Sequence, residues 1–408
     1  MRLEVLNTGT ELLLGSVINT HVKFLAEALF PIGLRINRQV TVPDGDAIRE
    51  AVQETFGRAD ILLVTGGLGP TTDDITREIV AELLALELIE DAEVWRQIEE
   101  RFARRQLCMS PRNRRQAMRP AEATVLWNPH GTAPGLYMPD FPEKNSPHIF
   151  LLPGPPRELQ PMVEDYVVPM LRKIVGQPTI SEMRVFRTAG LGESLVEEKV
   201  GEQLLSLGIE LGYCARPGEV DIRVIGTPEQ VRAAGDIIRG VFPSNVVSDD
   251  QRSLERVVVE ALTSREETLA IAESCTGGAI AHRITNVPGA SAVFLAGFVT
   301  YANEAKIKAL GVSKESLDQH GAVSEVVASA MAEGARTAAG ADYALSTTGI
   351  AGPTGGSEAK PVGTVFIGLA AKGAPTRVEK HFFPTDRERF KELVSQSALD
   401  FLRRNLRD

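Results

Sequence analysis

The sequence has few cysteines and no long apolar run. Its three cysteines, Cys108, Cys214 and Cys275, lie far apart and form no CxxC pair, which argues against a disulfide framework and favours a reducing compartment. No apolar stretch approaches the roughly 20 residues that a membrane-spanning helix needs, and no charged-then-apolar leader is visible at the N-terminus. These absences predict a cytoplasmic protein with no membrane partner.

The sequence also lacks an excess of positive charge. Its formal net charge of −10 falls entirely on residues 1–250, because residues 251–408 carry 18 basic and 18 acidic side chains. Neither part attracts a polyphosphate backbone by bulk charge, so we expect no nucleic-acid partner. A length of 408 residues exceeds one ordinary core, and an apolar content of 43% is enough for several domains.

The fold class predicted from the pattern of elements is α/β, in three domains. Residues 1–168 alternate apolar strands with helical patterns, as in a parallel sheet covered by helices in three layers. Residues 169–250 predict a small α+β domain, and residues 251–408 a further α/β domain. The clearest strands are expected at 3–6, 61–64, 148–152, 183–188, 220–225, 269–272 and 343–346, and the clearest helices at 21–29, 75–86, 231–241 and 279–284.

Ser274 is the strongest candidate for a catalytic residue. It follows the apolar run 269–272 and precedes the helical pattern 279–284. Gly277 and Gly278 allow a sharp turn there, and a serine at such a strand-to-helix switch is exposed to a substrate. Free N–H groups of the next helix can face an oxyanion. The alternative is a simple helix cap, which the local residues alone favour, because serine is a preferred cap residue.

Two further segments of this domain add chemistry to Ser274. Lys306 lies in the first turns of a helix expected to begin near residue 303, where the helix dipole and some burial would lower its pKa and make it a base. The segment 347–356 follows a predicted strand and could leave backbone N–H groups free for an anion. Together they predict a serine nucleophile with a lysine base and no cofactor. Taken singly, Lys306 is better explained as a solvated helix lysine, and the glycine segment is explained equally well as a plain surface turn.

The strings AESCTGG, YANEAK, HGAVS and GIAGPTGG with KPVGTV resemble the C-terminal domain of the CinA family over nearly all of residues 251–408. The resemblance implies an amidohydrolase that deamidates nicotinamide mononucleotide and releases ammonia. It places the family's serine–lysine pair on Ser274 and Lys306, with Tyr301 in a matching position. Our hypothesis is that Lys306 deprotonates Ser274 and the serine attacks the carboxamide. The expected substrate contacts are oxyanion donors at Thr276, Gly277 and Gly278 and a phosphate or ribose site at Thr348, Gly349, Gly352, Gly355 and Gly356.

A second glycine-rich segment, 65–74, follows the predicted strand 61–64 and opens a helix. Its glycines, Gly66, Gly67 and Gly69, suit a phosphate site. Asp73 and Asp74 would repel a phosphate unless a divalent cation lay between, although acidic residues also simply complement a helix dipole. Glu11 and Asn19 come from another strand-end loop that could line the same cleft.

Arginines crowd the segment that follows. They could clamp a diphosphate, or they could form a solvated helix face that balances Glu99 and Glu100, which we favour for most of them. The seven are Arg101, Arg104, Arg105, Arg112, Arg114, Arg115 and Arg119.

The N-terminal strings GTELLLGSVINT, TGGLGPTTDDIT, NRRQAM, GTAPG and LPGPPREL resemble the corresponding half of CinA proteins, which has the wider molybdopterin-binding fold. The resemblance implies a metal-dependent ADP-ribose pyrophosphatase, with Asp74 as a metal or phosphate-side residue and Asp73 and Glu11 as further metal candidates. Asn113 and Gln116 fall in the NRRQAM motif and are implied to contact ligand. The middle region resembles the family's KH-type spacer, and its segment 190–193 is no RNA-binding GxxG clamp.

The resemblance as a whole implies a homodimeric, bifunctional enzyme of pyridine-nucleotide recycling that acts on nicotinamide mononucleotide and ADP-ribose. Two alternatives stay open. One is a nucleotide- or pterin-binding module with a vestigial hydrolase domain, because fold alone does not fix function. The other is a partner protein in competence or recombination.

Overall fold

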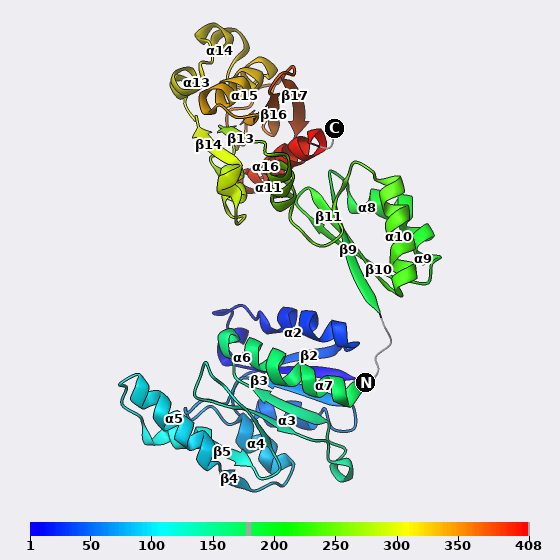
Figure 1. Cartoon of the computed structure of the whole chain (residues 1–408), viewed down its shortest axis with the longest axis vertical. Coiled ribbons are helices and arrows are strands. Elements are labelled where there is room, and N and C mark those ends of the chain that lie inside the picture. Colours follow the sequence, from blue (N-terminus) through cyan, green and yellow to red (C-terminus); the bar gives the residue numbers. More distant parts are fainter. Residues whose placement is uncertain (177–180, 407–408) are drawn as a thin grey trace. The chain divides into compact units, whose positions relative to one another are not determined.

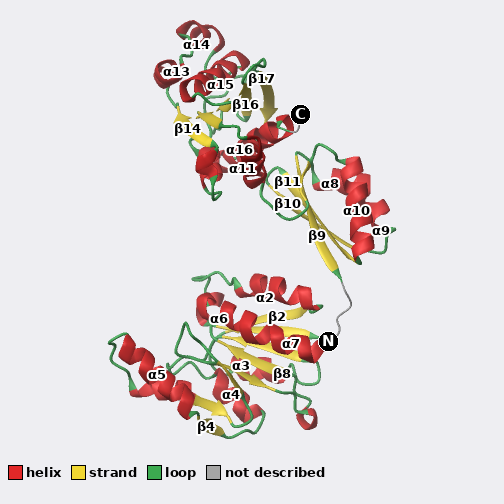
Figure 2. Ribbon diagram, in the orientation of Figure 1, coloured by secondary structure: helices red, strands yellow, loops and turns green. Residues whose placement is uncertain are grey.

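The computed structural model describes residues 1–176 and 181–406, and the chain divides into two compact units, Met1–Ser181 and Glu182–Asp408 (Figure 1). The first unit is a single α/β domain. The second contains a small antiparallel sheet with its helices and a larger α/β domain (Figure 2). Within the described ranges, no helix combines the length and apolarity needed to cross a membrane.

A six-stranded sheet of order β2-β1-β3-β8-β7-β6 forms the centre of the first unit. Its first four strands are parallel to one another. Strand β7 pairs antiparallel with β8, and β6 pairs antiparallel with β7. Both faces of the sheet are buried, since alternate residues of β3 point into two separate cores. The strands are β1 (Leu3–Thr8), β2 (Ile36–Val42), β3 (Ile61–Thr65), β8 (His148–Leu152), β7 (Gly135–Met138) and β6 (Thr124–Leu126).

Helices cover both faces of this sheet and give the predicted three layers. One core contains residues of α2 (His21–Leu29), α6 (Pro156–Met162) and α7 (Val168–Val175), and the opposite core residues of α3 (Ala47–Gln53) and α4 (Thr76–Leu83). Leu171 of α7 is fully buried there, so this domain continues past residue 168. The helix expected at 75–86 is wrong at its end, because Ala85 adopts a left-handed backbone with φ 50° and the chain turns into β4 (Leu88–Glu90).

A smaller lobe of the first unit projects beside the sheet (Figure 1). It contains α5 (Ala92–Arg104), the 3-10 turn η2 (Pro111–Ala117) and a two-stranded ribbon of β4 with β5 (Met118–Pro120). The Asp91 carboxylate caps α5 by accepting the N–H groups of Glu93 and Val94. Val94 and Ile98 pack with Ala117 in a separate cluster, which fixes α5 over the loop that contains Trp127.

The second unit begins with a four-stranded sheet of order β10-β11-β9-β12, in which all pairings are antiparallel. Its helices pack on this sheet through one core. The longest, α10 (Pro228–Val241), begins with the predicted cap, because Thr227 and Gln230 form a reciprocal capping box. The other elements are β9 (Glu182–Ala189), β10 (Glu210–Arg216), β11 (Glu219–Gly226), β12 (Val246–Ser248), α8 (Glu193–Val196) and α9 (Glu202–Leu205).

The C-terminal domain has a five-stranded sheet of order β14-β13-β15-β16-β17. Strands β13, β14 and β15 are parallel, so their carboxyl ends meet at one edge. Helices α11, α12 and α16 contribute to the core on one face, and α15 to the core on the other. The bounds are β13 (Leu269–Glu273), β14 (Phe294–Val299), β15 (Tyr343–Gly349), β16 (Thr364–Ala371), β17 (Arg377–Phe382), α11 (Leu254–Arg265), α12 (Ala279–Thr285), α13 (Asn303–Leu310), α14 (Lys314–His320), α15 (Glu325–Ala339) and α16 (Arg387–Asn405).

Candidate active site

Ser274 directly follows β13, at the edge where the parallel strands end. Its N–H donates to the carbonyl of Thr347 at 3.0 Å, which extends the β13–β15 ladder by one residue and fixes the serine backbone. The side chain is half-buried and lines a cavity of about 210 Å³. The central position of β13 in the sheet therefore places a hydroxyl at a small, partly enclosed site.

Lys306 contacts Ser274 from α13. Its Nζ lies 3.1 Å from Ser274 Oγ, 2.8 Å from the carbonyl oxygen of Thr300 and 3.1 Å from that of Tyr301. A neutral amine has two N–H bonds and one lone pair. When the two carbonyls accept both N–H bonds, the lone pair remains for the serine hydroxyl. This arrangement gives the neutral lysine the geometry of a general base.

The environment of Lys306 also favours the neutral amine. The residue is 1% exposed, and burial lowers the pKa of its side chain below the ordinary 10.5, against a smaller opposite effect of Cys275. Its partners within the described residues are two carbonyls and a hydroxyl, none of which carries the negative charge that would stabilise an ammonium ion. Desolvation without a counter-charge is the usual way to make a lysine basic enough to accept a proton near neutrality.

The expectation that Gly278 donates to an oxyanion is wrong. Its N–H donates to the carboxylate of Glu273 at 2.9 Å, and the same carboxylate accepts the N–H groups of Ile280 and Ala281. Glu273 is 1% exposed, so a buried negative charge already occupies the N-terminus of α12. An oxyanion bound there would meet electrostatic repulsion. Thr276 and Gly277 do not line the cavity, and their role as backbone donors to an oxyanion stays a prediction.

Cys275, which directly follows Ser274, is a poor nucleophile. Its side chain is buried, and burial raises the pKa of the thiol to about 12, so the thiol stays protonated near neutral pH. The residue packs in the main apolar core of the domain. Its role is therefore structural.

Tyr301 and Arg387 form the rim of the cavity. The Tyr301 side chain is 61% exposed, and Arg387 donates to its hydroxyl at 2.8 Å and to the carbonyl of Gly352 at 3.0 Å. Tyr301 touches Lys306 only through its backbone carbonyl, so its phenol does not tune the base directly. Sequence reasoning missed Arg387. The sequence feature that could have indicated Arg387 is its place in the first turn of α16, where the helix dipole disfavours positive charge.

The predicted glycine loop contributes only its first residues to this cavity. Thr348 and Gly349 line it, but they belong to β15 rather than to a loop. Gly352, Gly355 and Gly356 lie outside its lining. Packing explains two of these glycines, because a Cβ at Gly352 or Gly356 would come within 2.5 or 2.7 Å of Val362. The expected anion cradle along the whole segment is therefore not formed at the serine.

The glycine-rich segment of the first unit does form a cleft, of about 390 Å³, that is separate from the serine site. A Cβ at Gly66 would approach Thr8 to 2.6 Å, and one at Gly67 would approach Thr76 to 1.9 Å, so the turn requires both glycines. The structure brings together most of the residues predicted for this cleft: Glu11, Gly66, Gly67, Gly69, Asp73, Asp74 and Gln116.

Asn19 and Asn113 do not line this cleft. The side-chain oxygen of Asn19 accepts the N–H of His21, the first residue of α2, at 3.0 Å. Asn113 is buried, accepts the N–H of Ser110 and donates to Gln116 at 3.1 Å. Asn113 has a positioning role, since it orients Gln116, which does line the cleft. A ligand contact of Asn19 stays a prediction.

The predicted metal ligands share this cleft without forming a ligand cluster. Asp74 accepts the N–H of Thr71 at 3.0 Å and the hydroxyl of the same residue. In the described parts of the chain, no three His, Cys, Asp or Glu side chains are grouped closely enough to hold a metal ion. Glu11, Asp73 and Asp74 alone therefore do not form a metal site in the described residues, and their role as metal ligands stays a prediction.

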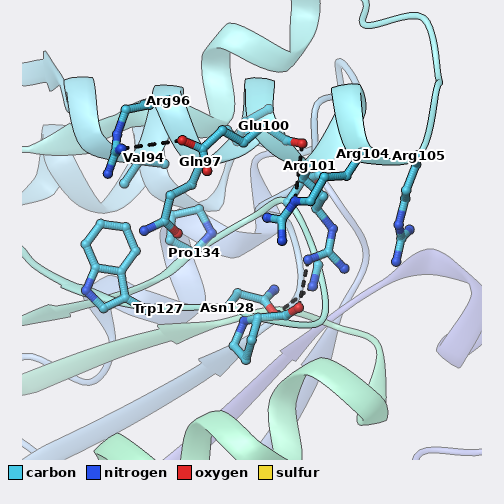
Figure 3. Close-up of a pocket in the computed structure, with 14 residues that line it drawn as sticks. Val94, Arg96, Gln97, Glu100, Arg101, Arg104, Arg105, Trp127, Asn128 and Pro134 are labelled. Atoms are coloured by element: carbon cyan, nitrogen blue, oxygen red, sulfur yellow. Dashed lines mark hydrogen bonds and ion pairs between the residues drawn. The ribbon is translucent and has the colours of Figure 1, made fainter.

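An arginine-lined pocket of about 540 Å³ opens on the projecting lobe (Figure 3). Arg101 and Arg104 point from α5 toward the loop of Asn128, and Arg101 donates to the carbonyl of Pro129. Thr132 lines both this pocket and the glycine-rich cleft. The two sites of the first unit are therefore neighbours.

The seven arginines of this segment separate into two groups. Arg101, Arg104 and Arg105 line the pocket of Figure 3. Arg114, Arg115 and Arg119 instead form ion pairs with Glu90, Glu78 and Asp91, which explains them as structural side chains. Arg112 is exposed and lines neither cavity.

Fold and site together define a three-domain protein with a molybdopterin-binding-like fold, a KH-like domain and a C-terminal α/β domain that has a serine–lysine pair. Three family descriptions match these parts: "Probable molybdopterin binding domain" over residues 4–173, "Damage-inducible protein CinA KH domain" over 183–241 and "CinA C-terminal domain" over 251–406. The chain belongs to the CinA family.

Relatives match along the full length of the chain. A CinA-like protein of Akkermansia muciniphila is 47% identical over 98% of this chain and 96% of its own length. A protein of Moorella thermoacetica named as competence-damage inducible is 44% identical over 100% and 99%. Among solved structures, a competence/damage inducible protein from Agrobacterium tumefaciens is 39% identical and covers 38% of this chain and 94% of its own, with a TM-score of 0.37.

Proposed function

We propose that the C-terminal domain is an amidohydrolase that converts the carboxamide of nicotinamide mononucleotide to the acid. The observation that carries the proposal is the buried Lys306 amine, 3.1 Å from the Ser274 hydroxyl and without a counter-charge among its partners. A serine activated in this way is a nucleophile for acyl transfer, and the chemistry requires no cofactor. The family resemblance supplies the identity of the amide.

The proposed reaction uses the two side chains in turn. Lys306 accepts the proton of Ser274 as Oγ bonds to the carboxamide carbon, and the carbonyl oxygen becomes an oxyanion. Backbone N–H groups of Thr276 and Gly277 stabilise that charge, at about 3 kcal/mol per donor. Lys306 returns the proton to the nitrogen, the C–N bond breaks and ammonia leaves. A water molecule, deprotonated by Lys306, then hydrolyses the ester and releases the acid.

The cavity is suited to one end of a mononucleotide. A volume of about 210 Å³ has room for a pyridine ring with its carboxamide. The exposed Tyr301 ring at the rim offers a π-face to the positively charged pyridinium. Arg387 lies over the same opening, where the sugar-phosphate part would emerge.

The test is release of ammonia from nicotinamide mononucleotide by the full chain. We expect the wild type to turn over. In Ser274→Ala, kcat should fall by at least about 1,000-fold, as in other enzymes whose nucleophile is removed. Ser264→Ala is the matched control, because Ser264 is exposed on α11. Near-normal turnover by Ser274→Ala would refute the assignment.

For the first unit we propose metal-dependent cleavage of a diphosphate such as ADP-ribose. The favouring observation is the adjacency of the glycine-rich cleft and the arginine pocket, which share Thr132. Glu11, Asp73 and Asp74 would hold the cation, which would neutralise substrate charge. Arg101 and Arg104 would contact the distal phosphate or ribose.

This second activity is tested with ADP-ribose and added Mg²⁺. Asp74→Asn should lose the cleavage, and Asp60→Asn is a control outside the cleft. Equal activity in both variants would refute the role of Asp74. We further propose that the enzyme is a cytoplasmic homodimer, which sedimentation of the purified chain checks for the oligomeric state.

A further inference from the structure

A second cleft adjoins the catalytic cavity within the Glu182–Asp408 unit. It has a volume of about 770 Å³ and lies between the β10–β11 hairpin of the KH-like domain and helices α12 and α16 of the C-terminal domain. Arg216 and Glu219 line it from the hairpin, and His282, Arg387 and Lys391 from the helices. Two domains of the chain thus build one cleft.

Direct contacts fix the hairpin against α16. Gln396 donates to the Glu219 carboxylate at 2.7 Å. Gly218, at the turn of the hairpin, approaches Gln396 so closely that an added Cβ would lie 2.9 Å from its Cγ. Arg403 of α16 donates to the carbonyl of Val246 at 3.2 Å. The position of Arg216 relative to α16 is therefore set by packing and hydrogen bonds across the domain boundary.

The cleft and the catalytic cavity share a wall. Arg387 lines both. Lys391, one helical turn further along α16, places its Nζ 3.9 Å from the Cβ position of Gly277, three residues after the nucleophile. A substrate that extends away from Ser274 past Arg387 enters the region of Lys391.

The cations of this cleft are incompletely neutralised. Within residues 1–176 and 181–406, neither Arg387 nor Lys391 forms an ion pair with a carboxylate, although both lie in the first turns of α16 against its dipole. Arg216 shares the carboxylate of Asp221 with Arg187. Of the acidic side chains in the lining, Glu219 is engaged by Gln396, and Glu388 and Glu392 are exposed.

We propose that Arg216 and Lys391 form, with Arg387, the subsite for the phosphate of the substrate, so that the KH-like domain determines the preference of the amidase for a nucleotide over a nucleoside. The proposal rests on the amidase function proposed above. It places the phosphate in the interdomain cleft instead of on the glycine loop, where Gly352 and Gly356 pack against Val362. Arg387 and Lys391, which form no ion pair with a carboxylate in the described residues, provide positive charge beside the catalytic cavity, and a phosphate monoester recognises such charge.

The experiment compares nicotinamide mononucleotide with nicotinamide riboside, which lacks the phosphate, in the full-length enzyme. Arg216→Ala and Lys391→Ala should each raise KM for the mononucleotide by about tenfold or more, on the scale of lost charge-assisted hydrogen bonds, and leave KM and kcat for the riboside unchanged. Lys391→Arg should retain most of the preference. Lys372→Ala is the control, because its side chain is 76% exposed and lies outside both cavities.

The outcomes separate the two proposals. If the wild type releases ammonia and both alanine variants keep the wild-type ratio of kcat/KM between mononucleotide and riboside, the subsite is refuted and the amidase stands. If the wild type releases ammonia from neither compound, the amidase is refuted and the subsite with it. If Arg216→Ala lowers kcat/KM equally for both substrates, the hairpin has a structural role, and the subsite is also refuted.

Discussion

Replacing Lys306 with methionine should abolish catalysis without unfolding the C-terminal domain. Methionine matches the length of the lysine side chain but cannot accept a proton. General-base catalysis contributes about 100- to 10,000-fold, so kcat for ammonia release should fall by that factor, equivalent to about 3–5 kcal/mol of barrier. Lys306→Arg should fail similarly, because arginine is not deprotonated in proteins.

The effect of the same substitution on stability should be small, because two contributions oppose each other. The carbonyls of Thr300 and Tyr301 lose a donor, which costs about 1–3 kcal/mol for buried groups left unpaired. A buried amine is removed at the same time, which recovers its desolvation penalty. We expect the free energy of unfolding to change by less than about 2 kcal/mol.

The assay is ammonia release at saturating nicotinamide mononucleotide, with thermal unfolding measured on the same samples. Lys308→Met is the matched control, since Lys308 is exposed on the same helix. A Lys306→Met protein that folds and turns over within fivefold of the wild type would refute the reasoning. If Lys306→Met loses activity and also melts at a lower temperature, Lys306→Arg and the pH dependence of the wild type test whether Lys306 is the base.

Three further predictions concern pH, the helix N-terminus and metal. Burial lowers the pKa of Lys306, so kcat/KM should rise with pH and level off above an apparent pKa that is below 10.5. The free energy of unfolding should also rise with pH between the lowered pKa and 10.5, because the unfolded chain binds more protons there. Both trends should vanish in Lys306→Met. Glu273→Gln should lower the melting temperature relative to Glu358→Gln, because the buried Glu273 carboxylate accepts three backbone N–H groups; equal melting temperatures would contradict this. A chelator should spare ammonia release and suppress ADP-ribose cleavage, and inhibition of both would contradict a metal-free amidase.

Local sequence patterns were sufficient to predict the elements that carry the candidate site. The apolar run at 269–272 and the following glycines indicated a strand and a turn, and β13 ends at Glu273 directly before Ser274. The cap at Thr227 was predictable because a capping box involves residues only three apart. The end of α4 was not, because the chain turns at Ala85, a left-handed position with φ 50° that no glycine marks in the sequence.

Side-chain direction and long-range contacts explain what the sequence did not reveal. The expected oxyanion donor at Gly278 failed because the adjacent Glu273 turns its carboxylate onto the N-terminus of α12, and strand position alone does not show that direction. Arg387 lies 86 residues from Tyr301 in the chain, so no local pattern joins them. The cleft at Arg216 depends on packing between two domains, which single segments cannot specify.

Detection of a covalent acyl-enzyme tests the central claim most directly. Full-length enzyme mixed with nicotinamide mononucleotide should be quenched in acid within one turnover and analysed by intact-protein and peptide mass spectrometry. The proposed chemistry predicts the acid mononucleotide as an ester on the peptide that contains Ser274, and its absence in Ser274→Ala. Multiple turnovers of ammonia release with no adduct on that peptide at any quench time, or with an adduct on Cys275, would contradict it.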